Sequence, residues 1–159
     1  MKKLLYSLLL LSLSGGSALW GVEYGGEKSY LYEIPYKVCP VAPLPEEAKK
    51  EGIQITTTKE ADKLFKAGAY FYDARRKAHY EQGHVKGAYP VLFDVSKARY
   101  TVLNLPKGEK TPLVFYCYGE TCANSYEAAL AVRHFGYTNV YWYAAGYAAW
   151  QKAGLPIEK

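Results

Sequence analysis

The chain has 159 residues, of which 50% are hydrophobic, and its 20 basic and 15 acidic side chains give a formal net charge of +5. This length allows one domain with a sizeable core and is too short for two ordinary domains. The mild basic excess indicates no nucleic-acid partner. The three cysteines cannot all pair within a monomer and are too few for a dense disulfide framework.

Residues 1–18 have the layout of a secretory signal peptide. A basic start with Lys2 and Lys3 is followed by an apolar run over residues 4–13 and then by small residues up to Ala18. The apolar run covers about ten positions, whereas a membrane-spanning helix needs about 20, so an uncleaved anchor is the weaker alternative. We expect cleavage near Ala18, which would leave a periplasmic protein of formal charge +3 with no membrane attachment.

Residues 19–50 form an N-terminal arm rich in tyrosine and proline. Its closely spaced prolines argue against a regular helix or a central strand. Aromatic residues are too numerous for a typical disordered linker. We therefore expect the arm to lie along the domain and to bury several of its rings.

Beyond the arm, residues 51–159 alternate short apolar stretches with helical patterns. Thr57 and Glu60 predict a capping box, and the helix that they begin ends at Gly68. The apolar run of residues 113–116 suits a central strand that is buried on both faces. The alternation predicts an α/β fold with a mostly parallel central sheet and helices on both faces. The predicted strands are residues 53–56, 69–73, 90–95 (a strand or a turn), 113–116 and 140–143, and the later helices are residues 125–135 and 147–153.

Cys117 stands directly after the predicted central strand, at the carboxyl edge where open α/β sheets bind ligands. The following loop leads into a helix, and Gly119 would let the loop curl so that backbone amides face the sulfur. Such amides, together with the helix dipole, would stabilise a thiolate without a histidine base. We therefore predict that Cys117 is a catalytic nucleophile, and a buried, inert cysteine is the alternative.

The loop after the nucleophile is the predicted substrate loop. Tyr118 follows Cys117 directly and must border any substrate. Beneath the loop, Asp73 and Arg75 are expected to form a supporting structural pair, although an arginine near a strand end could assist a charged donor. The predicted loop residues are Tyr118, Gly119, Glu120, Thr121, Cys122 and Ala123.

Residues 51–159 resemble a rhodanese domain, with five motifs in the order that the family shows. The resemblance implies a rhodanese-like three-layer fold and a cysteine that accepts sulfane sulfur as a persulfide and passes it to a nucleophile. It therefore implies a sulfurtransferase with a small sulfur donor, a thiol or protein acceptor and no cofactor. The motifs are Asp73-Ala74-Arg75, Tyr80-x-x-Gly83-His84-Val85-x-Gly87-Ala88, Leu113 to Cys117, Gly136-Tyr137-x-Asn139-Val140 and Gly146-x-x-x-Trp150.

The active-site loop departs from the family pattern, because it is longer and contains no arginine or lysine. Glu120 would instead repel a dianion such as thiosulfate. We therefore expect polysulfide or a protein persulfide to be favoured as donor. The sixth residue after Cys117 is Ala123, so the Cys-x5-Arg motif of cysteine phosphatases and arsenate reductases is missing.

Cys122 lies five residues after Cys117, and its thiolate could attack a Cys117 persulfide, expel hydrosulfide and leave a disulfide. Alternatively Cys122 is only a small loop residue, or a permanent bridge to Cys117 makes the domain a non-catalytic binding module. A third possibility is a bridge between Cys39 and Cys122 that leaves Cys117 free. The sequence alone does not fix this connectivity.

None of the three histidines is predicted to be a base or a metal ligand. We expect His79 at the surface, His84 as a structural hydrogen-bonding residue, and His134 in the last turn of a helix, where it favours the dipole. The Cys-x4-Cys spacing matches zinc sites poorly. Two other functions fit the loop: a non-catalytic sulfur carrier, and a thiol–disulfide redox protein that uses Cys117 and Cys122. The physiological donor, the acceptor and the oligomeric state are left open.

Overall fold

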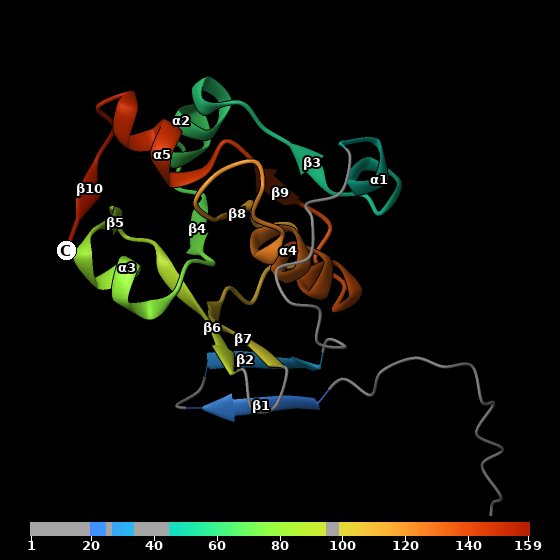
Figure 1. Cartoon of the computed structure of the whole chain (residues 1–159). Coiled ribbons are helices and arrows are strands. Elements are labelled where there is room, and N and C mark those ends of the chain that lie inside the picture. Colours follow the sequence, from blue (N-terminus) through green and yellow to red (C-terminus); the bar gives the residue numbers. More distant parts are fainter. Residues whose placement is uncertain (1–19, 25–26, 34–44, 95–98) are drawn as a thin grey trace, which may run out of the picture.

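The computed structural model describes residues 20–24, 27–33, 45–94 and 99–159 of the chain (Figure 1). The predicted signal peptide and Cys39 lie outside these residues. The elements are β1 (Trp20–Tyr24), β2 (Glu27–Glu33), α1 (Pro45–Lys50), β3 (Gln54–Ile55), α2 (Thr58–Lys66), β4 (Tyr70–Asp73), α3 (Lys77–Gln82), β5 (His84–Val85), β6 (Tyr89–Asp94), β7 (Arg99–Leu105), β8 (Leu113–Tyr116), α4 (Asn124–His134), β9 (Val140–Tyr143), α5 (Gly146–Lys152) and β10 (Ile157–Glu158).

One mixed sheet of eight strands organises the domain, in the order β1-β2-β7-β6-β4-β8-β9-β3. The strands from β6 through β4, β8 and β9 to β3 are parallel, and β7, β2 and β1 extend the sheet with antiparallel pairs. The short strands β5 and β10 pair separately. The predicted α/β fold with a mainly parallel central sheet and helices is confirmed.

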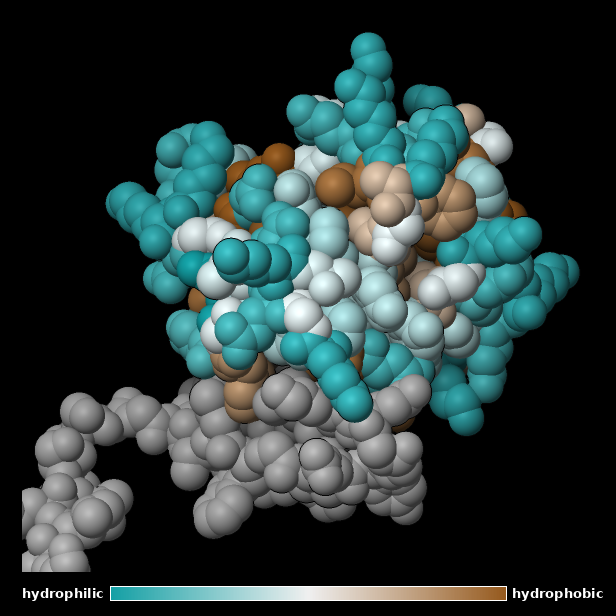
Figure 2. Space-filling view, turned by 180° about the vertical axis from the view of Figure 1, so that it is seen from behind, coloured by the Kyte–Doolittle hydropathy of each residue, from teal (hydrophilic) through white to brown (hydrophobic). Residues whose placement is uncertain are grey.

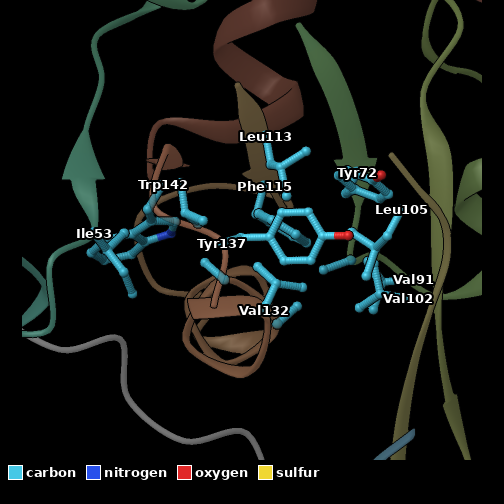
Figure 3. Close-up of a cluster of buried hydrophobic side chains, with 14 of the residues drawn as sticks. Ile53, Tyr72, Val91, Val102, Leu105, Leu113, Phe115, Val132, Tyr137 and Trp142 are labelled. Carbon is cyan, nitrogen blue, oxygen red and sulfur yellow. The ribbon is translucent and has the colours of Figure 1, made fainter. Parts of the chain in front are cut away.

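Strand β8 lies between β4 and β9, and all four of its side chains are buried. Leu113 and Phe115 pack on one face with the apolar side of α4 (Figure 3). Val114 and Tyr116 pack on the other face with residues of α2 and α5, among them Trp150. Burial on both faces explains the continuous apolar run, and it fixes the end of β8 rigidly within the domain.

Helix α2 begins with the predicted capping box. The Glu60 backbone N–H donates to Thr57 Oγ1 (3.3 Å), and the Glu60 carboxylate accepts from the Thr57 backbone N–H (2.8 Å). Two amides at the start of the helix are therefore satisfied by side chains. None of the helices in the described part of the chain is long and apolar enough to cross a membrane.

The N-terminal arm contains the strands β1 and β2 and the helix α1, so the prediction that its prolines exclude a regular helix or a central strand was wrong. Strands β1 and β2 form a hairpin that joins the sheet through β7, at the edge drawn in blue in Figure 1. Both strands end before the first proline of the arm, Pro35. Pro45 is the first residue of α1, where a missing N–H breaks no helical hydrogen bond.

The sequence also failed to predict four elements of the main domain, which are α3, β7 and the two short strands β5 and β10. Strand β7 has polar residues within its run, among them Thr101 and Asn104, so its apolar pattern is weak; pairing with β6 and β2 stabilises it. Helix α3 has no buried residue and therefore no apolar face that a pattern could reveal.

Candidate functional site

Cys117 lies at the carboxyl end of β8, where it is 1% exposed. The neighbouring strand β4 is parallel to β8, and Asp73 pairs with Tyr116 at the ends of the two strands. The chain leaving β4 therefore passes beside Cys117, whose sulfur lies 3.9 Å from the carbonyl oxygen of Ala74. This is the edge at which α/β sheets place their ligand sites.

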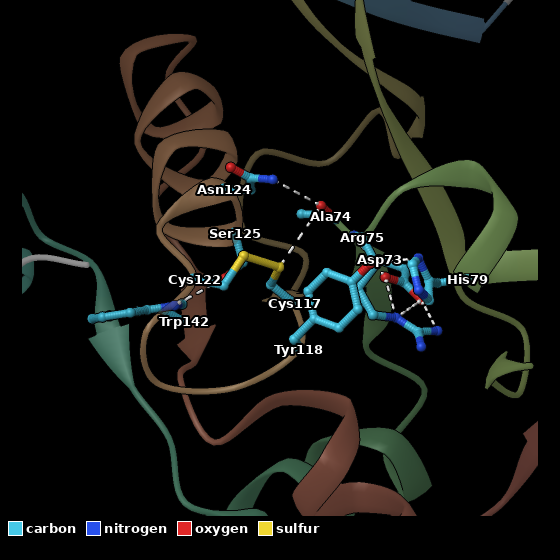
Figure 4. Close-up of a disulfide and its surroundings, with 10 residues drawn as sticks. All are labelled: Asp73, Ala74, Arg75, His79, Cys117, Tyr118, Cys122, Asn124, Ser125 and Trp142. Carbon is cyan, nitrogen blue, oxygen red and sulfur yellow. Dashed lines mark hydrogen bonds and ion pairs between the residues drawn. A yellow bond between two sulfur atoms is a disulfide. The ribbon is translucent and has the colours of Figure 1, made fainter. Parts of the chain in front are cut away.

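The sulfur of Cys117 is bonded to the sulfur of Cys122 (Figure 4). The loop turns back because the Cys122 backbone N–H donates to the carbonyl of Gly119 (3.1 Å). The two Cα atoms are consequently 6.2 Å apart, a separation that a disulfide spans without backbone movement. The hypothesis of a Cys39–Cys122 bridge that leaves Cys117 free is therefore contradicted, because Cys122 already has a partner.

The start of α5 holds the first half of the loop in place. The backbone N–H of Tyr147 donates to the carbonyl of Cys117 (2.8 Å), and that of Ala148 donates to the carbonyl of Tyr118 (3.2 Å). Gly146 makes this approach possible: its φ is +65°, and a Cβ there would lie 2.6 Å from the Cys117 carbonyl oxygen. The glycine that the loop requires for close approach is thus in α5.

Gly119 does not have the role that its position in the loop suggested. Its φ lies outside the left-handed region, and a Cβ there would meet only the carbonyl oxygen of Ala145, at an ordinary 3.7 Å. The position that needs a glycine, because of its positive φ and its close backbone contacts, is instead Gly146. The ring of amides around the Cys117 sulfur remains a prediction.

A buried ion pair lies beside the site, on the Cys117 side of the disulfide (Figure 4). The Arg75 side chain donates to both carboxylate oxygens of Asp73 (2.6–3.0 Å) and to the carbonyl of Gly83 (2.6 Å). The Tyr116 hydroxyl donates to Asp73 (2.8 Å) and accepts from the Val85 N–H (3.1 Å). Asp73 is fully buried and Arg75 is 6% exposed, so both charges of this hydrogen-bonded pair are desolvated.

Burial and the charges of this network shift the pKa values of Arg75 and Tyr116. Burial alone would lower the pKa of Arg75, but its hydrogen bonds to Asp73 and the charge of that carboxylate outweigh burial and raise the pKa. Burial first, and then the charge of Asp73, raises the pKa of Tyr116 well above its ordinary value. Arg75 stays cationic and Tyr116 stays neutral, and the arginine charge is already compensated by Asp73.

Tyr118 connects the loop to this network and to α3. Its ring lies 6.0 Å from the Arg75 guanidinium, which is stacked more closely on Tyr147 at 3.7 Å from that ring's centroid. The Tyr118 hydroxyl is hydrogen-bonded to Nδ1 of His79, and the two rings meet edge to face. With 40% of its surface exposed, Tyr118 borders the solvent side of the site. Sequence reasoning placed His79 simply at the surface and missed this contact, for which the sequence gives no local signal.

The remaining loop residues divide between solvent and core. Glu120 and Thr121 are exposed at the tip of the loop, whereas Ala123 is buried at the start of α4. On the Cys122 side, Ser125 accepts a hydrogen bond from the indole N–H of Trp142 (3.1 Å). The structure thus brings the predicted loop residues together around the two sulfurs, with the only carboxylate of the loop in water.

The other two histidines lie outside the loop, in β5 and α4. His84 stacks on Tyr80 and hydrogen-bonds the backbone carbonyl of that residue (2.9 Å), as expected of a structural histidine. His134 lies exposed in the last turn of α4. Within the described ranges, no group of three or more His, Cys, Asp or Glu side chains is placed to hold a metal ion.

Comparisons with known proteins agree on one family. The family model of the rhodanese-like domain matches residues 57–153. The thiosulfate sulfurtransferase GlpE of Actinobacillus succinogenes is 29% identical over 105 residues, which are 66% of this chain and 89% of that protein.

Solved structures show the same fold. A protein of unknown function from Rhodopseudomonas palustris, described as a possible tyrosine phosphatase, gives a TM-score of 0.54 at 24% identity, over 79% of this chain and 99% of that one. The polysulfide-sulfur transferase homodimer of Wolinella succinogenes gives a TM-score of 0.50 at 18% identity, over 71% of this chain and 85% of that one. At these identities the likeness concerns the fold alone.

Proposed function

This chain belongs to the family of rhodanese-like domains, and we propose that it is a sulfurtransferase that carries sulfane sulfur on Cys117. The observation that carries the proposal is the position of this cysteine, at the carboxyl end of the central strand β8 and beside the chain leaving β4. A nucleophile held at the end of a rigid strand has a fixed direction of attack, which favours reaction with a bound donor.

Transfer takes place in two displacements. The Cys117 thiolate attacks the sulfane sulfur of the donor, a new S–S bond forms, and the rest of the donor leaves with the electron pair of the broken bond. An acceptor nucleophile then attacks the outer sulfur of the persulfide and expels Cys117 as a thiolate. No net oxidation occurs, because the sulfur atom moves with its six valence electrons between two nucleophiles.

The disulfide sets the condition under which this cycle starts. With its sulfur bonded to Cys122, Cys117 has no thiolate to offer a donor. Sulfur transfer therefore begins from the dithiol form, and the bridged form is a resting state that a thiol must open. We also propose that the protein works in an extracytoplasmic compartment, which the residue pattern of positions 1–18 supports.

Among donors, polysulfide or a protein persulfide is proposed to react faster than thiosulfate. Arg75 is the cation of the Asp-x-Arg motif beside the site, and its charge is compensated by Asp73. The loop itself contributes only the carboxylate of Glu120. A dianion would consequently gain little attraction on approach.

This donor preference predicts that Glu120→Arg raises the relative rate with thiosulfate, by about threefold to tenfold at low salt and less at high salt. The same change at Glu46, on the exposed surface of α1, is the matched control and should leave the ratio of the two donors unchanged. Equal rates with thiosulfate and polysulfide in the unchanged protein would contradict the preference.

The test of the function itself uses reduced protein, a persulfide donor and cyanide as a simple acceptor, with thiocyanate formation measured above the uncatalysed rate. Cys117→Ser should abolish the catalysed rate while circular dichroism shows an intact fold. Cys122→Ser should retain it. Turnover that survives in Cys117→Ser would refute the proposal.

A second candidate function is thiol–disulfide exchange, which the bond between Cys117 and Cys122 specifically favours. The same two variants separate the candidates, because a dithiol redox cycle needs both sulfurs. Loss of all activity in Cys122→Ser, with sulfur transfer absent from the unchanged protein, would favour the redox function.

A further inference from the structure

We propose that Cys122 is a resolving thiol that releases the sulfur carried on Cys117 as hydrogen sulfide, so that the protein reduces sulfane sulfur as well as transferring it. The inference rests on the proposed persulfide at Cys117. It starts from the observation that the loop brings the two sulfurs into direct contact. A second thiol at this position reaches the inner sulfur of the persulfide without help from another molecule.

Both ends of the loop are anchored so that this contact needs no large movement. The carbonyls of Cys117 and Tyr118 accept hydrogen bonds from the start of α5, and Gly146 lets the two backbones approach. At the other end, the Cys122 N–H is held by the carbonyl of Gly119, and α4 begins two residues later, at Asn124. Attack within such a fixed loop is unimolecular, which gives it a large advantage over an acceptor from solution.

The reaction balances in atoms and electrons. The Cys122 thiolate attacks Sγ of Cys117, the bond between that atom and the outer sulfur breaks, and the outer sulfur leaves as hydrosulfide with the electron pair. The proton lost by the Cys122 thiol supplies the one that hydrosulfide carries. The sulfane sulfur gains two electrons, and the two cysteines lose them by forming the disulfide.

An external dithiol must return these electrons, and burial indicates where it reacts. Cys117 is almost completely buried, whereas Cys122 is only partly buried. A reductant thiolate therefore attacks Cys122 and expels Cys117 as the thiolate that the next donor needs. The dithiol is oxidised to its own disulfide, and over the full cycle one sulfane sulfur becomes hydrogen sulfide.

A purely structural bridge explains the position of Cys122 less well. The disulfide joins two residues of one loop, with a sequence separation of 5. A cross-link over so short a loop restricts the unfolded chain less than one between distant segments, so it contributes less to stability. It also occupies the one sulfur that the family motif predicts to be reactive.

The experiment loads reduced, desalted protein with one equivalent of glutathione persulfide under anaerobic conditions. This donor releases glutathione, so free sulfide reports only the second step. In wild-type protein we expect about one sulfide per protein and a final mass equal to that of the Cys117–Cys122 disulfide form. In Cys122→Ser we expect a stable mass gain of one sulfur atom and sulfide release at least about tenfold slower.

Cys39→Ser is the matched control. This variant lacks the third cysteine and should release sulfide like the wild-type protein. Cys122→Ala provides a second variant, with circular dichroism confirming the fold of each. A wild-type persulfide as long-lived as that of Cys122→Ser would overturn the inference alone. If no form of the protein gains sulfur, the proposed function is refuted, and the resolving role of Cys122, which depends on it, is refuted as well.

Discussion

Gly146 is the residue that fits the reactive loop onto the rest of the domain. Three backbone atoms of the loop, in Cys117, Tyr118 and Gly119, lie within 2.8 Å of the position that its Cβ would take. No flexible side chain is available to give way, because all three contacts are backbone. The geometry of the nucleophile therefore depends on a residue of another element, about thirty positions along the chain.

This dependence predicts that Gly146→Ala weakens both stability and sulfur transfer. Gly154→Ala is a matched control, since Gly154 has nearly the same φ, +66°, and no atom within 4 Å of its Cβ position. The control should cost about 1 kcal/mol of unfolding free energy for the left-handed backbone. Gly146→Ala should cost about 1–3 kcal/mol more and slow transfer, as measured by chemical denaturation and turnover. Equal effects of the two variants would show that the close approach is unimportant.

Asp73 is a second residue outside the loop on which the site depends, in this case through its charge. Its carboxylate is fully buried against Arg75 and also accepts from Tyr116. Asp73→Asn would leave a buried guanidinium without its anion, so we expect a loss of about 3–5 kcal/mol in unfolding free energy. Glu81→Gln, which removes the exposed pair with Lys77, should cost less than about 1 kcal/mol. Similar losses in urea denaturation would mean that the buried pair is not desolvated in solution.

At the scale of elements, the capping box of α2 is a local feature that both sequence and structure contain. The α2 helix packs Ala61 against the face of the sheet that also contacts α5. If α2 is less stable, the packing of α5 on this face is less stable too, and α5 is the helix whose backbone holds the active-site loop.

Removal of the cap should be measurable. Thr57→Ala loses the hydroxyl that accepts from Glu60 N–H, and we expect the free energy of unfolding, measured by urea denaturation, to fall by about 1 kcal/mol. Thr57→Ser keeps the hydroxyl and should change this free energy little. Hydrogen bonds from the backbone and side chain of Thr57 lower the pKa of Glu60 below its ordinary value. This contribution is present above the unfolded-state pKa and disappears as the pH falls through the lower folded-state value. A Glu60→Gln variant whose stability depends on acid pH in the same way as wild type would contradict this.

For the whole molecule, the sequence predicted the parallel core because each strand buried on both faces is a continuous apolar run, as in residues 113–116. It did not predict the hairpin of β1 and β2 or the strand β7, whose stability comes from pairing with one another and with β6. The sequence also left open which cysteine pairs with Cys122, because the pairing depends on how the loop turns at Gly119. Local patterns therefore predicted the core, and the rest depended on strand pairing and loop geometry that leave no periodic pattern in the sequence.

The surface of the domain is largely hydrophilic on the side drawn in Figure 2, with smaller hydrophobic areas between the hydrophilic side chains. Among the residues whose side chains the structure describes, Tyr118 is one of three large hydrophobic residues that are exposed, together with Leu92 and Ile157. Because Tyr118 lies next to the nucleophile, an acceptor or donor molecule that reaches Cys117 would contact this ring.

The most direct test of a persulfide on Cys117 uses Cys122→Ser, in which the resolving step is blocked. The reduced variant is loaded with glutathione persulfide, alkylated, digested and analysed by mass spectrometry of its peptides. We predict one additional sulfur atom, located on the peptide that contains Cys117. Additional sulfur on the Cys39 peptide instead, or none on either, would contradict it.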